Sequence, residues 1–235
     1  RFPILKDGLA ASWKDELQEI DFSNIATDQI EVRPSKVAGI SRLSNELAED
    51  SSPAAADLVG SGLATQIAER IDVTWFGAAG VAPVPSGIES LGAGTPPCTK
   101  VVADPAALTN LDPFVEARFV AEQNRAKLTN WIINPDVAKA ISKLKVQTGS
   151  NQSLLEIVTD GLRIAGLPVL ISPHVPATVA FYGIDREQAL FVLRKGTVVE
   201  RSRDSAFSVD GVDVRAIARV GWCWVNPAGV IRGSK

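Results

Sequence analysis

This chain has few of the residues on which catalytic and metal sites depend. Among 235 residues it has one histidine, two cysteines and no methionine. Cys98 and Cys223 are far apart and form no Cys-x-x-Cys pair, so two reduced thiols are expected rather than a zinc site. His174 lies between prolines, and no Gly-x-Ser-x-Gly elbow supplies a serine for a Ser-His-Asp triad. We therefore predict no catalytic residues, no metal and no cofactor.

Motifs that bind phosphate groups and segments that span membranes are also missing. Gly60-Ser-Gly62 lacks the third glycine of a dinucleotide fingerprint, and residues 77–80 lack the Gly-Lys-Ser/Thr of a P-loop. The longest apolar runs, such as residues 167–171, are too short to cross a bilayer, so no membrane partner is expected. The net charge of −3, with scattered Lys and Arg, gives no overall attraction to nucleic acid.

What the chain does contain is one well-marked long helix. Ser52 can cap its start and Pro53 fits its first turn, so a helix is predicted from about Pro53 to Asp72. Gly60 and Gly62 each weaken this helix by about 1 kcal/mol relative to alanine, which predicts a bend or close packing there. An apolar stripe recurs every fourth residue and predicts packing onto a sheet: Val59, Leu63, Ile67 and Ile71.

The first 44 residues are predicted to form an extended hairpin. Residues 2–5 and 10–13 lead out, the polar segment from Asp15 to Asp28 turns, and residues 30–38 return with alternating apolar positions. A long two-stranded ribbon is marginal alone in water, and its edges and apolar face need to be covered. The residues alone do not decide whether a neighbouring subunit or the chain's own domain covers the ribbon.

The rest of the chain predicts an α+β fold. One helix is expected with Asp112 as its cap and Pro113 at its first position, and another from Pro135 to Lys145 with Asn134 as its cap. Strands are predicted at residues 131–133, 169–171, 179–182, 189–193, 197–203 and 212–225. The last strand has a half-buried pattern, with Val214, Ala216, Ala218, Val220 and Trp222 on one face and Arg215, Ile217 and Arg219 on the other.

Four stretches carry a family resemblance. The first joins an acidic junction at Ser44, Glu46, Leu47, Asp50 and Ser51 to the long helix and to the exit from Phe76-Gly77 through Pro85-Ser-Gly-Ile88. The others are Trp131-Ile-Ile-Asn-Pro135, residues 165–173 with Gly-Leu-Pro-Val, and residues 198–207 continuing to Ile231-Arg-Gly233. In this order they resemble the major capsid proteins of tailed bacteriophages, the Hong Kong 97 capsid fold family.

The resemblance implies an α+β Hong Kong 97-type capsid fold with three parts. These are an extended loop over residues 1–44, a peripheral domain over 45–128 and 194–225 that carries the long helix, and an axial domain over 129–193 and 226–235. The implied function is a structural subunit, not an enzyme, that self-assembles through pentamers and hexamers into an icosahedral head around double-stranded DNA. The DNA is contacted non-specifically, and a portal, a scaffold and a maturation protease are implied partners. The location is the virion, assembled in the cytoplasm of a bacterial host.

Charged residues near the long helix are candidates for the subunit interface. Glu46, Glu49 and Asp50 precede the helix, where carboxylates gain about 0.3–1 kcal/mol from its dipole. A second interpretation adds ion pairs to a neighbouring subunit. The interface candidates are then Lys14, Arg33, Glu46, Asp50, Arg201 and Arg203.

Some members of this family join their subunits through an isopeptide bond between a loop lysine and an asparagine, helped by a glutamate. An ungapped comparison places Asp210 at the asparagine position and Ile217 at the glutamate position. Aspartate has no amide to displace and isoleucine cannot move a proton. Non-covalent shells are therefore expected, although Lys6 and Lys14 lie in the loop region.

Three other hypotheses stay open. An encapsulin-like nanocompartment would enclose protein instead of DNA, and a monomeric binding module would not assemble at all. An enzyme would need a site in the Gly/Pro-rich loop 77–97, where Glu89 is the only carboxylate. Because the chain begins Arg1-Phe-Pro without methionine, we expect that a preceding segment has been removed as a cleaved scaffold, by shortening of the gene product or by proteolysis.

Overall fold

The computed structural model describes residues 2–5, 13, 16, 27–50, 55–93, 98–145, 156–158 and 161–235. The chain divides into two compact units, residues 1–33 and 34–235, and each is described by itself. In the first unit, β1 (Phe2–Leu5) pairs antiparallel with β2 (Thr27–Ile30), with Phe2 opposite Ile30 and Leu5 opposite Thr27. The base of the predicted hairpin is thus confirmed, and most of its turning segment lies outside the described residues.

The strand expected to complete the hairpin belongs instead to the second unit. β3 (Ser35–Ser44) pairs antiparallel with β11 (Gly211–Trp224) along its whole length. The predicted hairpin over residues 1–44 is therefore too long at its C-terminal end. Pro34 separates the two strands because it has no N–H to donate to a ladder. The alternating apolar pattern is the same for a ribbon strand and for a half-buried sheet strand, so it could not separate them.

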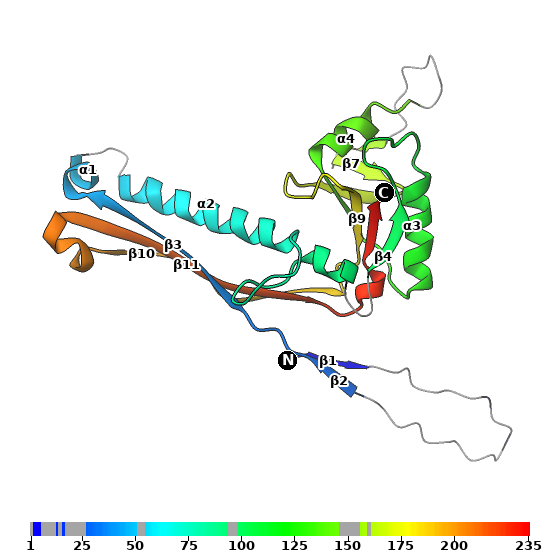
Figure 1. Ribbon diagram of the computed structural model, residues 1–235, viewed down its shortest axis with the longest axis horizontal. Coiled ribbons are helices and arrows are strands. Elements are labelled where there is room, and N and C mark those ends of the chain that lie inside the picture. The colour runs from blue at the N-terminus through cyan, green and yellow to red at the C-terminus, as the bar shows by residue number, and fades with distance from the viewer. Residues whose placement is uncertain are drawn as a thin grey trace. The chain divides into compact units, whose positions relative to one another are not determined.

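A three-stranded antiparallel sheet supports the long helix. Its order is β10 (Ala189–Ser202), β11 and β3, and α2 (Ala55–Trp75) lies along one face of it (Figure 1). The predicted apolar stripe is confirmed, since Val59 and Leu63 pack near Val214 and Ile67 packs on neighbouring alanines of β11. The predicted cap at Ser52 and Pro53 lies outside the described residues. The predicted two faces of β11 are also confirmed, with its alternate apolar residues buried under α2.

The two helix glycines are not equivalent. Gly60 is buried, and a Cβ placed on it would lie 3.1 Å from Cγ1 of Val199 on β10. A Cβ on Gly62 would meet nothing within 4 Å. The close packing expected from the sequence is therefore present at Gly60 and not at Gly62.

We expect Gly62→Ala to raise the free energy of unfolding by up to about 1 kcal/mol, because alanine restricts the unfolded chain and favours helix. Gly60→Ala is the matched control and should give no such gain, since its methyl group would press against Val199. Urea unfolding followed by far-UV circular dichroism measures both. Equal gains for the two variants would contradict this account of the packing.

The strands predicted at residues 189–193 and 197–203 form the single strand β10 of 14 residues. Its pairing with β11 shifts register between Leu193 and Lys195 and again between Lys195 and Val198. Such bulges absorb extra residues without ending the ladder, and Gly196 lies in the second one. The 3-10 helix η2 (Asp204–Val209) then connects β10 to β11.

The C-terminal part of the second unit is a mixed sheet. Its strand order is β4 (Thr99–Val102), β12 (Ile231–Ser234), β9 (Val179–Ile184), β5 (Asn130–Ile133), β8 (Leu167–Ile171), β7 (Gly161–Ile164) and β6 (Glu156–Val158). α3 (Asp112–Gln123) and α4 (Pro135–Ser142) pack on the same side of it (Figure 1). The backbone N–H of Asp136 donates to Oδ1 of Asn134 at 3.0 Å, which confirms the predicted cap of α4. The predicted cap of α3 at Asp112 is wrong, because Asp112 is the first residue of the helix, the cap position is Leu111, and no side chain caps it.

β4 and α3 lie in this C-terminal layer, although the boundary predicted at residue 128 groups them with the long helix. The reason is a non-local pair, because β4 runs parallel to β12 at residues 231–234. No local pattern signals a pairing over that distance. The 3-10 helix η3 (Pro227–Gly229) leads into β12.

The central strand β9 of the mixed sheet is buried on both faces. On the side of α3 and α4, the rings of Phe114, Trp131 and Phe181 pack together, with Trp131 edge-on to both phenylalanines at 5.2 Å between centroids. On the other side, Phe76 from the end of α2 stacks near Tyr182, and η1 (Ile88–Ala93) covers the sheet beside it. The helix α2 therefore packs on the three-stranded sheet along its length, and Phe76 directly after it packs on the mixed sheet. None of its described helices is long and apolar enough to cross a membrane.

Candidate subunit interface

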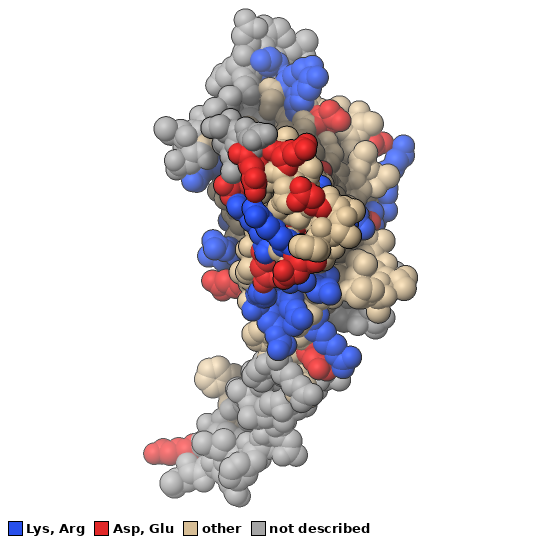
Figure 2. All heavy atoms as spheres, turned by 90° about the vertical axis from the view of Figure 1, so that its left-hand side faces the viewer, with Lys and Arg blue, Asp and Glu red and all other residues tan. Residues whose placement is uncertain are grey.

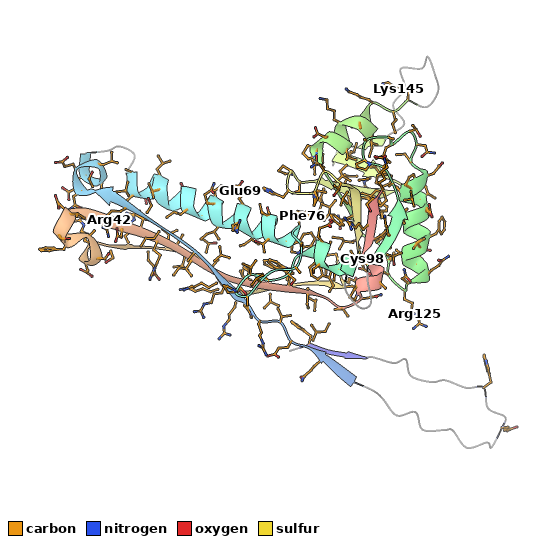
Figure 3. The ribbon with its side chains drawn as sticks, viewed as in Figure 1. Arg42, Glu69, Phe76, Cys98, Arg125 and Lys145 are labelled. Carbon is orange, nitrogen blue, oxygen red and sulfur yellow. The ribbon has the colours of Figure 1, made fainter. Side chains whose placement is uncertain are left out.

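The three-stranded sheet has one face that α2 leaves uncovered, called here the uncovered face. Side chains directly opposite one another on the three strands form rows across it. From the η2 end, the rows are Ser202–Asp213–Arg42, Glu200–Arg215–Ile40, Val198–Ile217–Ala38 and Lys195–Arg219–Lys36. Side chains project from this side of the strands in Figure 3, where Arg42 is labelled near α1 (Asn45–Asp50).

The first row is held by a buried carboxylate. Nε and Nη2 of Arg42 donate to the two oxygens of Asp213 at 2.7 and 2.9 Å, and the hydroxyl of Ser205 on η2 donates to the same group. The hydrogen bond from Arg42, followed by that from Ser205, lowers the pKa of Asp213 to about 2. Asp213 is only 6% exposed. The bidentate pair and the bond from Ser205 therefore join β3, β11 and η2 in one geometry. Sequence reasoning missed it because the partners are 171 residues apart.

The second row carries a more exposed ion pair. Arg215 on β11 donates to Glu200 on β10 directly opposite, and this hydrogen bond lowers the pKa of Glu200. Ile40 completes the row and is 65% exposed. Beside it is a shallow hollow of about 300 Å³ lined in part by Ile40, Glu200, Asp213 and Arg215.

Two of the predicted interface cations have acidic partners within the chain. Arg201 donates to Asp57 at the start of α2, and Nη2 of Arg203 lies 3.5 Å from Oε1 of Glu49 on α1. Both pairs are half-exposed, so they contribute little to stability and can exchange for partners on another molecule. Figure 2 looks onto the end that carries α1 and shows acidic and basic side chains interspersed there.

The structure shows fewer contacts for the other predicted interface residues, and two of their side chains lie outside the described residues. Arg33 donates to Glu31 at 3.2 Å within the first unit. Glu46 is exposed on α1, whose start is capped by Ser44, with Oγ accepting from the backbone N–H of Leu47 at 3.3 Å. Lys14 and the side chain of Asp50 lie outside the described residues. Of the predicted acid–base partners, the structure brings Glu49 and Arg203 together.

Asp210 has a structural role at the end of η2. It adopts a left-handed conformation with φ of 47°, and its carboxylate accepts a hydrogen bond from the side chain of Asn45. Its carbonyl oxygen also accepts from the backbone N–H of Asn45 at 3.0 Å. Asp210 therefore ties η2 to the start of α1. Ile217 lies in the third row of the uncovered face.

Glu89, proposed from the sequence as part of a possible enzyme site, is fully engaged by two neighbours. The hydroxyl of Tyr182 donates to one of its oxygens, and Nη2 of Arg232 lies 2.9 Å from the other. Burial, and then the bond to Glu89, raises the pKa of Tyr182, while burial raises the pKa of the nearby Cys98 thiol. The bonds from Tyr182 and Arg232 to Glu89 fasten η1 to the sheet. The raised pKa values keep the tyrosine and the thiol protonated, so neither is an activated nucleophile.

His174 and the possible metal ligands form no reaction centre among the described residues. His174 is half-buried in a turn, and its backbone N–H donates to Oγ of Ser172 at 3.4 Å. Within the described ranges, no group of three His, Cys, Asp or Glu side chains could hold a metal ion. The geometry of the second unit is that of a scaffold with a charged, partly apolar open sheet face.

Comparison with known proteins gives one consistent result. Residues 1–234 match the phage capsid family. The capsid polyprotein of Pseudomonas phage PAJU2 is 27% identical over 175 residues, which is 72% of this chain, but the chain spans only 25% of that polyprotein.

Solved structures agree in fold across almost the whole chain. The capsid of an empty GTA particle superimposes with a TM-score of 0.79 and 19% identity, covering 99% of this chain and 84% of the other. A chain from Mycobacterium phage Bobi gives a TM-score of 0.77 with 13% identity and the same coverage.

Proposed function

Because this chain belongs to the phage capsid family and is a structural capsid subunit with the Hong Kong 97-type fold, we propose that its copies assemble into a closed shell through the ribbon of the first unit. The observation that carries this proposal is the β1–β2 pairing. The described pairing is that of a two-stranded ribbon, and a ribbon of two strands is marginal alone in water. Contact with a neighbouring copy would stabilise it.

Exposed apolar residues in both units support self-association. Trp13 in the ribbon is fully exposed, and Phe207 on η2 is 89% exposed. Burying such side chains contributes about 25 cal/mol per Å² of apolar area. Division of this free energy among many weak joints gives a shell that is stable collectively while each joint can still adjust.

The finer parts of the proposal follow from family membership. Pentamers and hexamers would close into an icosahedral head that encloses double-stranded DNA through non-specific contacts. A portal, a scaffold and a maturation protease would act on the assembly in the cytoplasm of the bacterial host, and the subunit itself would have no catalytic activity. An encapsulin-like compartment is not favoured, because the matching family and the curated relative are phage capsid proteins.

The experiment is to express and purify the chain, extended at its N-terminus by any segment its gene encodes, and to image it by negative-stain and cryo-electron microscopy. We expect closed shells. On a denaturing gel the shells should run as a single band, because Asp210 and Ile217 occupy the positions where an isopeptide bond would need asparagine and glutamate. A chain that stays monomeric at high concentration would contradict the assembly, and a ladder of multimers on the gel would contradict the non-covalent joint.

A further inference from the structure

We propose that a row of three cations on the uncovered face is the seat for the acidic tip of the ribbon from a second copy. The seat, called here the cationic row, consists of Lys195, Arg219 and Lys36. The ribbon tip is residues 15–26, before β2 begins at Thr27. This inference rests on the proposed function, and it names the surface and the charges through which one subunit would hold the next.

The cationic row is an unfavourable arrangement within one chain. Arg219 lies directly opposite Lys195 on one side and directly opposite Lys36 on the other, and all three residues are exposed. Like charges in directly opposite positions destabilise a sheet. Such a row is stabilised when an anion lies across it.

The cations in the first two rows of the uncovered face have carboxylate partners within the chain. Arg42 and Arg215 pair with Asp213 and Glu200. Among the described residues, no ion pair joins a member of the cationic row to a carboxylate. Lys195 adds only a weak attraction that helps to lower the pKa of Glu200. The row therefore carries three charges available to a partner.

The ribbon tip has the opposite charge. Its 12 residues contain four carboxylates and no lysine or arginine: Asp15, Glu16, Glu19 and Asp21. It is supplied once per subunit, as is the cationic row, so each row in a closed ring can receive one tip. Complementary charges of this kind fix the register of an interface and suppress wrong pairings.

The apolar residues of the two surfaces also match. Next to the cationic row, Ile217 is half-buried and Val198 is 37% exposed, and beyond them Ile40 borders the 300 Å³ hollow. The ribbon tip alternates its carboxylates with Leu17, Ile20, Phe22 and Ile25. A segment of this composition can place charges on the cationic row and apolar side chains on the neighbouring strip. Duplex DNA would satisfy the charges but not the apolar strip.

The test uses charge reversal on each side and then mixing. A face variant carries Lys36→Glu, Lys195→Glu and Arg219→Glu, and a tip variant carries Glu16→Lys, Glu19→Lys and Asp21→Lys. The matched control reverses three exposed lysines of the C-terminal layer, Lys100→Glu, Lys139→Glu and Lys143→Glu. Light scattering and electron microscopy follow assembly of each full chain at low salt, and circular dichroism verifies folding.

We expect each of the two variants alone to assemble at least about tenfold more slowly than the unmodified chain, because like charges then face each other. The control should assemble normally. An equimolar mixture of face and tip variants should recover assembly, since each tip then finds a complementary row on the other variant. If the face variant does not fold, glutamine at its three positions should still slow assembly, but less, because the attraction is lost without adding repulsion.

Four results would overturn the inference. A face variant that assembles like the control would remove it and leave the proposed function standing. Recovery only when all six changes are in one chain, and not on mixing, would mean that the ribbon lies on its own subunit. Loss of duplex DNA binding in the face variant, with normal assembly, would make DNA the occupant. An unmodified chain that forms no shells would remove both the inference and the proposed function.

Discussion

A chain whose ribbon is shortened to its base should fold normally and form no shells. In this variant residues 6–26 are replaced by Asn-Gly, which joins Leu5 directly to Thr27. These two residues are the last pair of the β1–β2 ladder, so a two-residue turn of this kind closes the hairpin without changing its register. The second unit keeps its entire core, because that core is built from residues after Pro34.

We expect shell assembly to be lost completely, because the segment proposed to reach the neighbouring copy is absent. The melting temperature should change by less than about 3 °C, the shift that about 1 kcal/mol produces in a domain of this size. Sedimentation velocity and electron microscopy measure the first effect, and scanning calorimetry measures the second. Normal shells from the shortened chain would show that the ribbon is dispensable and that the joint lies elsewhere.

Trp131→Ala should have the largest effect on the stability of the subunit itself. The indole is fully buried between the rings of Phe114 and Phe181, and its Nε1 donates to the carbonyl oxygen of Ile164 at 2.9 Å. Removing it leaves a cavity under α3 and an unpaired buried carbonyl. We expect the free energy of unfolding to fall by about 3–5 kcal/mol.

The chain provides its own control for this substitution. Trp13 is fully exposed in the ribbon, so Trp13→Ala removes the same side chain without creating a cavity. Urea unfolding should show almost no change for Trp13→Ala and a large loss for Trp131→Ala. Similar losses for both would mean that the packing around Trp131 does not hold the C-terminal layer together.

The elements that sequence reasoning predicted well are those with strong local signals. The long helix shows its stripe at Val59, Leu63 and Ile67, and the short helix α4 is capped by Asn134. The face assignment along β11 follows from simple alternation. These patterns depend on residues a few positions apart, so no tertiary information is needed to read them.

Misplaced elements were those whose position depends on distant partners. β3 was grouped with the ribbon and β4 with the long helix, because the strands that pair with them, β11 and β12, lie far along the sequence. The same holds for the interface. Single charges such as Arg203 could be proposed from the sequence, but the bidentate Arg42–Asp213 pair and the cationic row exist only once three strands are aligned.

The position of β12 affects the order in which the subunit can be completed during synthesis. Residues 231–234 lie between β4 and β9 in the sheet, although both of those strands leave the ribosome much earlier. Until β12 arrives, β4 has no hydrogen-bonding neighbour and the sheet stays open beside β9. A polypeptide that ends before residue 231 therefore lacks an inner strand of this sheet.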